Sequence, residues 1–522
     1  SLMHTLDAMM PQPAPGEATV PLFFVAQIPR DAVPGWYTAK VQVSANEQSW
    51  ELPVQILVSP AVLPDARDFS SLMGLYSSPE TVAILGKVTP YSDEHLKLME
   101  PSFAMQAQVG NDILHVPVVL GGFGATATTW MGRGFDGPNP RRRVPMIRWV
   151  RKDGKLTPDF TVLERFLDRY LRFCAPPKAL GLYIWDTSYV SEIGIAYEST
   201  RVPTRAYAPM SRFVIAVWDP ATDTLTDHPA PQFVDPDAEA FWKPMLDGVR
   251  DLVKRRGWSE DCIMLGQGGD MRPGSNTVER LRQWAPYARW SVLSHFSGDP
   301  GGPQADGRFI GAGGLEIGLM ETIYYKPLSL ASLEDQILRP ARYLNLCPQR
   351  NSHNDASSPL LFRTLALISG AHTRLSLDYW PGGPGHGSGW FNNTRHTSVF
   401  GPRGAIPTVR FQMFREGVQE LEICRMIVKE LQGKPAEVRA KYGRLVDAVG
   451  LQHPQFVGIP PSFEKATDLV GRSARLMAAL SELAGNPGQD RWDAPPPVAG
   501  LAERLRDEQL AFDMPAATGE IH

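Results

Sequence analysis

The stretch that decides the fold is Cys262-Ile-Met-Leu-Gly-Gln-Gly-Gly-Asp-Met-Arg-Pro273. A short apolar run breaks into glycines and then presents one carboxylate, Asp270, before a helix-compatible segment over residues 275–284. A buried strand that ends in a turn delivers a polar group to a pocket in this way. The stretch therefore predicts a strand, a turn and a helix, with a candidate functional residue in the turn.

Seven further segments of similar strand character lie on both sides of this one. They cover residues 72–76, 113–119, 180–185, 290–295, 322–325, 343–347 and 375–379. Helical patterns separate them, over residues 93–108, 161–173, 237–256, 276–284, 333–341 and 359–370. This alternation, without a dinucleotide-binding turn to anchor a doubly wound sheet, favours an α/β fold of the (β/α)8 TIM-like barrel type.

Two long insertions, residues 121–155 and 189–233, each follow the end of a predicted strand. In a barrel these ends lie on the carboxyl face, where the loops build the active site. We therefore expect both insertions on the face where the chemistry takes place.

The two ends of the chain have other patterns. Tyr37, Ala39, Val41 and Val43 alternate with polar residues, and residues 52–58 repeat the alternation, which predicts an antiparallel sheet with one buried face. Apolar residues spaced by three and four over residues 418–431 and 469–483 predict closing helices. We assign residues 1–64 to an N-terminal β-sandwich portion, 65–432 to the barrel and 433–522 to a C-terminal helical extension packed on the barrel.

The composition restricts the classes of partner and cofactor. The 522 residues include 52 Lys+Arg and 56 Asp+Glu, and a net charge of -4 gives no electrostatic case for nucleic acid or an anionic membrane. No apolar run is long enough to span a bilayer, and residues 1–15 lack the basic-then-apolar order of a signal peptide. The 4 cysteines are scattered without histidines at ligand spacing, so we expect buried thiols and no metal or other cofactor.

Three separated stretches, taken in order, resemble one known family. They are Ile28-Pro-Arg-Asp-Ala-Val-Pro-Gly-Trp-Tyr37 with Leu63-Pro64, the strand end at 262–273, and Arg410-Phe-Gln-Met-Phe-Arg-Glu-Gly-Val-Gln-Glu-Leu-Glu422. Together they resemble glycoside hydrolase family 123, which combines an N-terminal β-sandwich, a TIM-like barrel and a late closing helix. The resemblance implies an exo-acting hydrolase of N-acetyl-hexosaminides, in which the acetamido oxygen of the substrate is the nucleophile, and it favours a periplasmic or extracellular location.

The family keeps an Asp-Glu pair at the end of its fourth strand, and this chain departs from that pattern. Residues 266–271, Gly-Gln-Gly-Gly-Asp-Met, contain Asp270 and no adjacent carboxylate, so the mechanism does not carry over intact. We expect Asp270 to act as general acid, with Asp186 after the third strand or Asp378 after the eighth as partner carboxylate. The alternative for Asp270 is a helix cap or a turn residue. Glu321, at the start of the predicted sixth strand, is a poorer candidate.

Substrate-binding candidates are aromatic, amide, imidazole and guanidinium side chains near strand ends or in the loops above them. Tryptophans can stack on sugar rings, although large aromatics also dominate cores. Arg141, Arg142, Arg143, Arg148 and Arg151 make the first insertion basic, which is either a solvated loop face or a site for an anionic sugar. The candidates are Gln267, Trp185, Trp380, Trp390, His386, His115, His295 and Arg143.

The sequence therefore predicts a glycoside hydrolase that acts on an oligosaccharide or polysaccharide at the carboxyl face of a TIM-like barrel, with carboxylates that differ from the family pair. The missing pair leaves one alternative open, a catalytically silent relative that binds glycans. A polysaccharide lyase acting on anionic sugars is a second alternative, compatible with the basic insertion.

Overall fold

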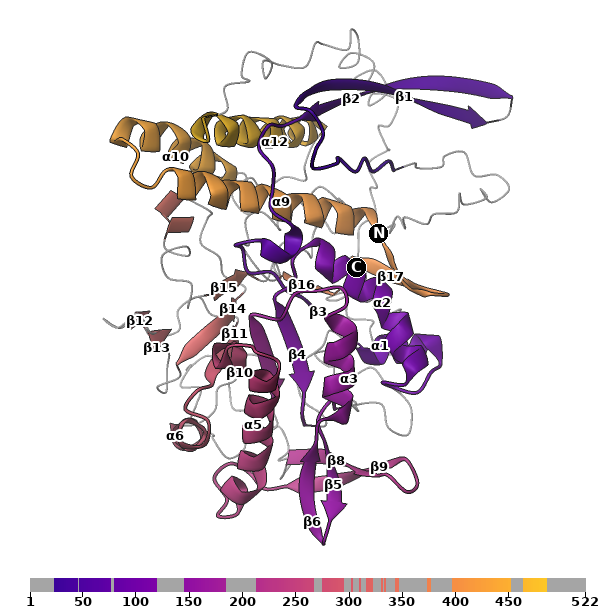
Figure 1. The fold of residues 1–522 in the computed structure, drawn as a ribbon, viewed down its shortest axis with the longest axis vertical. Helices are drawn as coiled ribbons and strands as arrows, with labels where there is room; N and C mark the ends of the chain where they lie inside the picture. The colour runs from indigo at the N-terminus through magenta and orange to yellow at the C-terminus, as the bar shows by residue number, and fades with distance from the viewer. Residues whose placement is uncertain are drawn as a thin grey trace, which may run out of the picture. The chain divides into compact units, whose positions relative to one another are not determined.

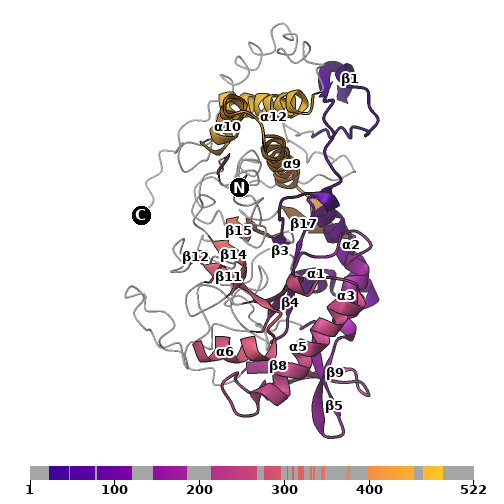
Figure 2. The ribbon, with the colours of Figure 1, turned by 60° about the vertical axis from the view of Figure 1, so that its left-hand side comes forward.

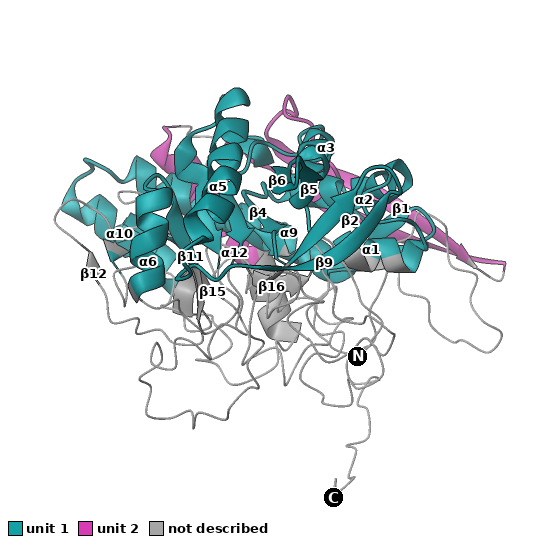
Figure 3. Cartoon of the chain, turned by 90° about the horizontal axis from the view of Figure 1, so that it is seen from below, with its two compact units in different colours: residues 1–26, 63–469 teal, residues 27–62, 470–522 magenta. Residues whose placement is uncertain are grey.

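The computed structural model describes residues 23–45, 47–76, 79–119, 145–184, 213–266, 275–294, 302–303, 309–310, 316–322, 330–331, 333–334, 343–346, 373–376, 397–451 and 463–485. The chain divides into two compact units (Figure 3). One comprises residues 1–26 and 63–469, and the other comprises residues 27–62 and 470–522. No described helix is long and apolar enough to cross a membrane.

A six-stranded parallel sheet organises the larger unit. Its order is β15 (Tyr343–Leu346), β14 (Ile317–Thr322), β11 (Arg289–Ser294), β10 (Ile263–Gly266), β7 (Ala179–Tyr183) and β4 (Ile113–Pro117). All five neighbouring pairs are parallel, so all six carboxyl ends lie along one edge. The predicted α/β class with a parallel sheet is confirmed, and the opening stretch supplies β10 as expected.

Two further strands extend this order. β16 (Thr373–Ser376) pairs in parallel with β3 (Leu75–Tyr76), and an isolated parallel bridge joins Met73, just before β3, to Asn111, just before β4. The last predicted strand of the series therefore pairs with the first. No pairing between β15 and β16 occurs among the described residues, so a complete (β/α)8 barrel is not confirmed.

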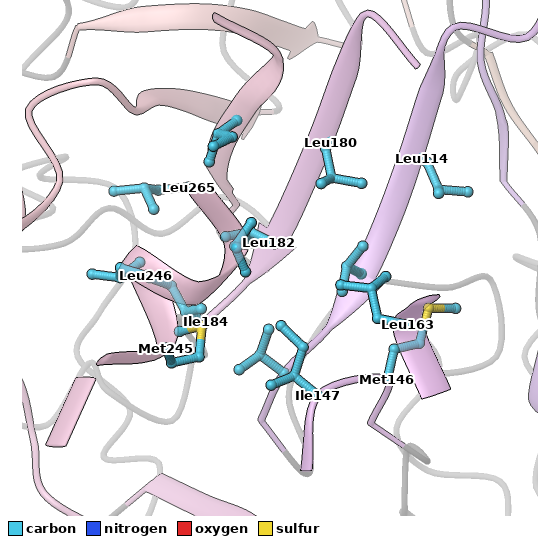
Figure 4. Close-up of a cluster of buried hydrophobic side chains, with 14 of the residues drawn as sticks. Leu114, Met146, Ile147, Leu163, Leu180, Leu182, Ile184, Met245, Leu246 and Leu265 are labelled. Carbon is cyan, nitrogen blue, oxygen red and sulfur yellow. The ribbon is translucent and has the colours of Figure 1, made fainter. Parts of the chain in front are cut away.

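Helices cover one face of the sheet. α2 (Asp93–Gln108) starts where the Ser92 side chain accepts a 3.2 Å hydrogen bond from the backbone N–H of His95. α3 (Thr161–Tyr170), α5 (Ala238–Arg255) and α6 (Ser275–Trp284) follow within a few residues of their predicted bounds (Figures 1 and 2), and α1 (Pro79–Gly86) precedes them. Apolar residues of β4, β7 and β10 meet those of α3 and α5 in a single buried cluster (Figure 4).

Each of the two insertions ends in a hairpin. β5 (Arg148–Lys152) with β6 (Lys155–Asp159), and β8 (Phe213–Asp219) with β9 (Thr224–Ala230), join into one sheet of order β6-β5-β8-β9. The backbone N–H of Met146 donates to the Pro117 carbonyl at the end of β4 (3.0 Å), and in Figure 1 the β4 arrow points toward this sheet. The hairpins therefore stand beyond the carboxyl ends, on the side that the sequence predicts for both insertions.

A buried aromatic group fixes this small sheet to α5. The Trp149 ring of β5 stacks on Phe241 at 5.5 Å and meets Trp242 edge-on at 5.8 Å. Trp149 and Trp242 are fully buried, and truncating a buried aromatic side chain of this kind to alanine costs roughly 3–5 kcal/mol. The insertions are thus anchored to the core at their hairpins.

The ends of the chain form a hairpin and long helices. β1 (Gly35–Ala45) and β2 (Gln48–Val58) pair antiparallel in a register that gathers the alternating apolar residues on one face, as predicted. Tyr37, Trp50 and Leu52 on that face are 44%, 47% and 48% exposed, and the described residues show two strands here, so a β-sandwich is not confirmed. α9 (Val409–Glu430), α10 (Ala436–Leu451) and α12 (Phe463–Leu483) close the chain.

The predicted apolar stripe over residues 418–431 is buried along α9 and at Leu431, which follows the last residue of the helix. Short two-stranded sheets complete the described structure, namely β12 (Gly302–Pro303) with β13 (Phe309–Ile310) and β17 (Ser398–Gly401) with β18 (Gly404–Pro407).

Candidate active site

The strand register defines rows of residues across the sheet. Residues paired in register lie on the same face, and alternate residues of a strand lie on opposite faces. Leu114, Leu180, Leu182, Ile263 and Leu265 belong to the core beneath the helices, so the residues between them lie on the opposite face. The first row on that face contains His115, Gly181, Met264 and Arg289, and the next row toward the carboxyl edge contains Pro117, Tyr183, Gly266 and Ser291.

Two glycines, Gly181 and Gly266, lie on this face near the carboxyl edge. A Cβ at Gly266 would stand 3.1 Å from the Leu182 carbonyl oxygen and 3.4 Å from Cδ2 of Tyr183, so a side chain there would crowd the neighbouring strand. A Cβ at Gly181 would stand 3.6 Å from Nδ1 of His115, an ordinary contact. The absence of a side chain at Gly266 lets the Tyr183 ring lie close against β10.

His115 is the one sequence-predicted site residue among those described. It lies two residues before the end of β4, rather than at the tip, and its ring packs against Tyr183 with centroids 5.3 Å apart. Both ring nitrogens are inaccessible to solvent, and burial lowers the pKa of His115 to about 3. The imidazole is therefore neutral, and it can exchange a hydrogen bond without carrying charge.

The other predicted site residues lie outside the described residues, and their roles stay predictions. They are Asp270, Asp186, Asp378, Gln267, Trp185, Trp380, Trp390, His386, His295 and Arg143. Several follow a described strand closely along the chain: Asp186 comes two residues after Ile184, Asp378 two residues after Ser376, and Asp270 four residues after Gly266. Each of these strands ends at its carboxyl edge just before the candidate.

The structure corrects the position of Glu321. The sequence placed the sixth strand at residues 322–325, with Glu321 at its start, whereas β14 spans Ile317–Thr322 and Glu321 is its penultimate residue. The apolar run continues across both segments, so its pattern alone does not fix where the strand begins. Gly318 lies at a register shift opposite Trp290 and Ser291, so this glycine marks a bulge within the strand.

The described arginines of the basic insertion have structural roles. Arg148 forms a 2.9 Å ion pair with Asp159, and the two side chains are 11% and 17% exposed. Its guanidinium also lies 4.1 Å from the centroid of the Trp218 ring, whose indole N–H donates to Asp223. The Arg148 guanidinium therefore has partners within the protein, and the expectation that the basic insertion binds an anionic sugar stays a prediction.

The opposite, amino edge contains a hollow lined by polar groups. Its lining includes Asp65, Arg67, Asn111, Asp112 and Cys174. Asp112 accepts from the backbone N–H of Met73 (3.2 Å) and pairs with Lys178 at 3.1 Å, while burial raises its pKa to about 7. Burial also raises the pKa of the Cys174 thiol to about 12, so it is not a nucleophile at neutral pH. These groups hold strands together and do not converge on a reacting centre.

The α9 segment that carries part of the family resemblance also acts at the amino edge. The Glu422 carboxylate accepts from the backbone N–H groups of Ser70 (2.8 Å) and Ser71 (3.0 Å), just before β3. Arg425 donates from Nε to the Ser70 hydroxyl at 2.9 Å. Glu422 is fully buried, so the helix motif fixes the start of the first strand.

Comparisons with known proteins agree with this arrangement. Residues 76–292 match the family model described as glycoside hydrolase 123, catalytic domain. A solved family 123 glycoside hydrolase from Clostridium perfringens, studied for the details of glycolipid glycan hydrolysis, is similar with a TM-score of 0.57 and 12% identity, over 88% of this chain and 77% of that chain. At this identity the likeness concerns the fold. A search of curated proteins finds no match.

Proposed function

Because this chain is a glycoside hydrolase family 123-like protein and a glycosidase, we propose that it hydrolyses a glycosidic bond of an oligosaccharide or polysaccharide at the carboxyl edge of its parallel sheet. The observation that carries this proposal is the placement of that edge. The matched residues 76–292 run from the end of β3 into β11, and the segments holding Asp186 and Asp270 directly follow β7 and β10. Catalytic groups of such folds come from the ends of several strands.

The proposed architecture around this edge is the barrel of residues 65–432. The pairing of β16 with β3 supports closure, because it brings the last strand of the series against the first. The N-terminal portion, residues 1–64, and the helical extension, residues 433–522, complete the proposed domain organisation.

The chemistry requires an acid and a partner carboxylate. Asp270 protonates the leaving glycosidic oxygen as the bond from that oxygen to the anomeric carbon breaks. The partner, supplied by Asp186 or Asp378, either takes a proton from the attacking water or attacks the anomeric carbon itself. This pair replaces the adjacent Asp-Glu pair of the family, which the chain lacks after β10.

The remaining predicted residues form the proposed substrate site. Trp185, Trp380 and Trp390 offer stacking faces to sugar rings, and Gln267, His386, His295 and Arg143 offer hydrogen bonds to hydroxyl groups. His115 and Tyr183 pack together beneath this edge on the β4 and β7 side and support the strand ends. The pairing of Arg148 with Asp159 favours an uncharged substrate over the uronate of a lyase.

The test compares two aspartates at opposite ends of the same strand. Asp270→Asn follows β10, and Asp261→Asn lies before it in an exposed 3-10 helix turn (Glu260–Cys262). On a panel of aryl glycosides and polysaccharides that includes N-acetyl-hexosaminides, we expect Asp270→Asn to lose about 10²–10⁴-fold in kcat and Asp261→Asn to match the wild type. Equal activity of the two variants would remove Asp270 from the mechanism.

A further inference from the structure

A short segment lies across the amino edge of the parallel sheet, just before the first strand. It covers residues 65–73, and we call it the amino-edge strap. It begins with a turn of 3-10 helix (Ala66–Asp68), where a Cβ at Gly110 would collide with the Ala66 carbonyl oxygen, so the turn packs directly against the end of α2. It ends at Met73, which bridges to Asn111 just before β4. The strap therefore connects the start of β3 to the elements around the amino edge.

Two buried carboxylates from different elements hold this strap. Asp112, which precedes β4, accepts from the backbone N–H of Met73 at 3.2 Å. Glu422 of α9 accepts from the backbone N–H groups of Ser70 (2.8 Å) and Ser71 (3.0 Å). The Asp112 side chain is 5% exposed and Glu422 is 1% exposed. The strap is thus in place only while two acidic side chains lie inside the protein, where a charge without a partner is costly.

The positive charge at this position is smaller than the negative charge. Among the described residues, Lys178 is the one cation that forms a salt bridge with either carboxylate. Its ammonium lies 3.1 Å from Asp112 Oδ1 and donates to the Phe69 carbonyl of the strap at 3.1 Å. Two buried carboxylates beside one ammonium favour the protonated form of one of the acids, because like charges and burial both oppose ionisation.

Asp112 is the acid that keeps its proton. Burial raises the pKa of Asp112 to about 7, Lys178 opposes this rise, and the like charge of Glu422 adds to it. Burial also raises the pKa of Tyr170 and of the Cys174 thiol, so both groups stay neutral near pH 7.

The remaining charged groups beside the two carboxylates have other partners. Asp65 and Arg67 line the same hollow as Asp112, and they pair with each other at 3.2 Å while 52% and 64% exposed. Arg425 of α9 donates from Nε to the Ser70 hydroxyl. These groups therefore leave the contact of Asp112 with the strap dependent on the protonation of Asp112 itself.

We propose that the amino-edge strap is a pH-sensitive latch, which is closed while Asp112 carries a proton and opens as that proton is released to solvent. With Asp112 neutral, its oxygen still accepts from the Met73 N–H, and the Lys178 ammonium balances the charge of Glu422. Once Asp112 is ionised, the closed strap holds two like charges, and opening the strap exposes Asp112 to water. Because β3 follows the strap and pairs with β16, the latch controls the pairing of the first strand with the last.

Hydrogen exchange of the full chain, followed by mass spectrometry from pH 4 to 8, tests the latch. Exchange rates of residues 69–73, corrected for the intrinsic rate at each pH, give the opening equilibrium constant. In the wild type this constant should rise by up to about tenfold per pH unit between pH 4 and 7 and level off above pH 7, because the closed strap alone keeps the proton over that range.

Three variants and one internal reference complete the test. Asp112→Asn keeps an acceptor for Met73 and should remove the rise, whereas Asp68→Asn, an exposed acid in the same strap, is the matched control and should keep it. Lys178→Met removes the balancing ammonium and should extend the rise above pH 7. The exchange of α5 reports opening of the whole fold.

Two results would overturn the latch. A wild-type profile no steeper than that of Asp112→Asn would remove the proton from the opening. Equal opening constants for residues 69–73 and for α5 at every pH would show that the strap opens only when the whole fold does.

Discussion

The amino and carboxyl edges of the same parallel sheet are built from different kinds of residue. At the amino edge, Asn111 donates from Nδ2 to the Tyr170 hydroxyl (3.0 Å) and accepts from the backbone N–H of Leu75 (2.8 Å), while Glu422 accepts two backbone N–H groups. At the carboxyl edge, the described row contains Pro117, Tyr183, Gly266 and Ser291, and neutral His115 lies in the row before it. Polar groups that satisfy one another stabilise a fold, whereas the carboxyl ends of parallel strands are where the catalytic groups of such folds are carried.

The largest expected effect is at the amino edge. Glu422→Ala leaves the backbone N–H groups of Ser70 and Ser71 without their acceptor, and each unsatisfied buried donor costs about 1–3 kcal/mol. We expect the free energy of unfolding to fall by about 2–5 kcal/mol in urea titrations. Glu430→Ala, at the exposed end of the same helix, is the control, and an equally small change in both variants would contradict the assigned role of Glu422.

Two glycines on the site face differ in the space around them. Gly266→Ala places a methyl group 3.1 Å from the Leu182 carbonyl oxygen, whereas Gly181→Ala places one at an ordinary 3.6 Å from His115. We expect Gly266→Ala to cost about 1–3 kcal/mol of stability, and Gly181→Ala to cost less than 1 kcal/mol. Chemical unfolding measures the stability of both variants. A larger loss of stability for Gly181→Ala than for Gly266→Ala would show that the register at β10 is wrong.

The pH dependence of stability distinguishes a buried acid from a buried base. The pKa of Asp112 is raised to about 7 by burial, so its stabilising contribution is full below about pH 4 and is lost as pH rises through 7. The pKa of His95 is lowered to about 4 by burial, so its contribution is present above about pH 6.5 and is lost as pH falls through 4.

Unfolding midpoints measured from pH 4 to 8 test the loss of stability predicted for Asp112. Asp112→Asn should remove the loss of stability between pH 4 and pH 7 that the wild type carries at this residue. An identical pH profile for the two proteins would contradict a raised pKa at Asp112.

The smallest expected effect is in the four-stranded sheet β6-β5-β8-β9 of the two insertions. Arg148→Ala removes a partly buried ion pair with Asp159 and the contact with Trp218, together about 1–2 kcal/mol. The kcat/KM values for neutral and for uronate-containing glycosides should change by the same factor, because Arg148 holds the sheet. A selective loss of kcat/KM on the uronate substrate would instead indicate that the basic insertion binds anionic sugars.

Local patterns in the sequence predict much of this fold, but they do not predict pairings between residues that are far apart in the chain. The Ser92 cap followed by Asp93 and Glu94 gives α2 the bounds that the pattern predicts. In contrast, the register shift at Gly318 depends on pairing with β11, and the sequence placed β14 too late along the chain. The contact between Glu422 and Ser70 joins residues 352 positions apart, which no local pattern reveals.

The candidate site is predicted less completely than the fold, for a related reason. Asp270, Asp186 and Asp378 could be named because each follows an apolar run that reads as a strand. Which of them meet depends on how strands far apart in the sequence are ordered, and the register supplied that order. The roles of these three residues stay predictions.

The most direct test of the central claim measures stability and turnover together in two carboxylate variants, one from each edge. For Asp270→Asn we predict an unchanged urea midpoint and a kcat lower by about 10²–10⁴-fold. For Glu422→Ala we predict a lower midpoint and an unchanged kcat for the folded fraction. An unstable Asp270→Asn with normal turnover, beside a stable and inactive Glu422→Ala, would contradict the assignment of chemistry to the carboxyl edge.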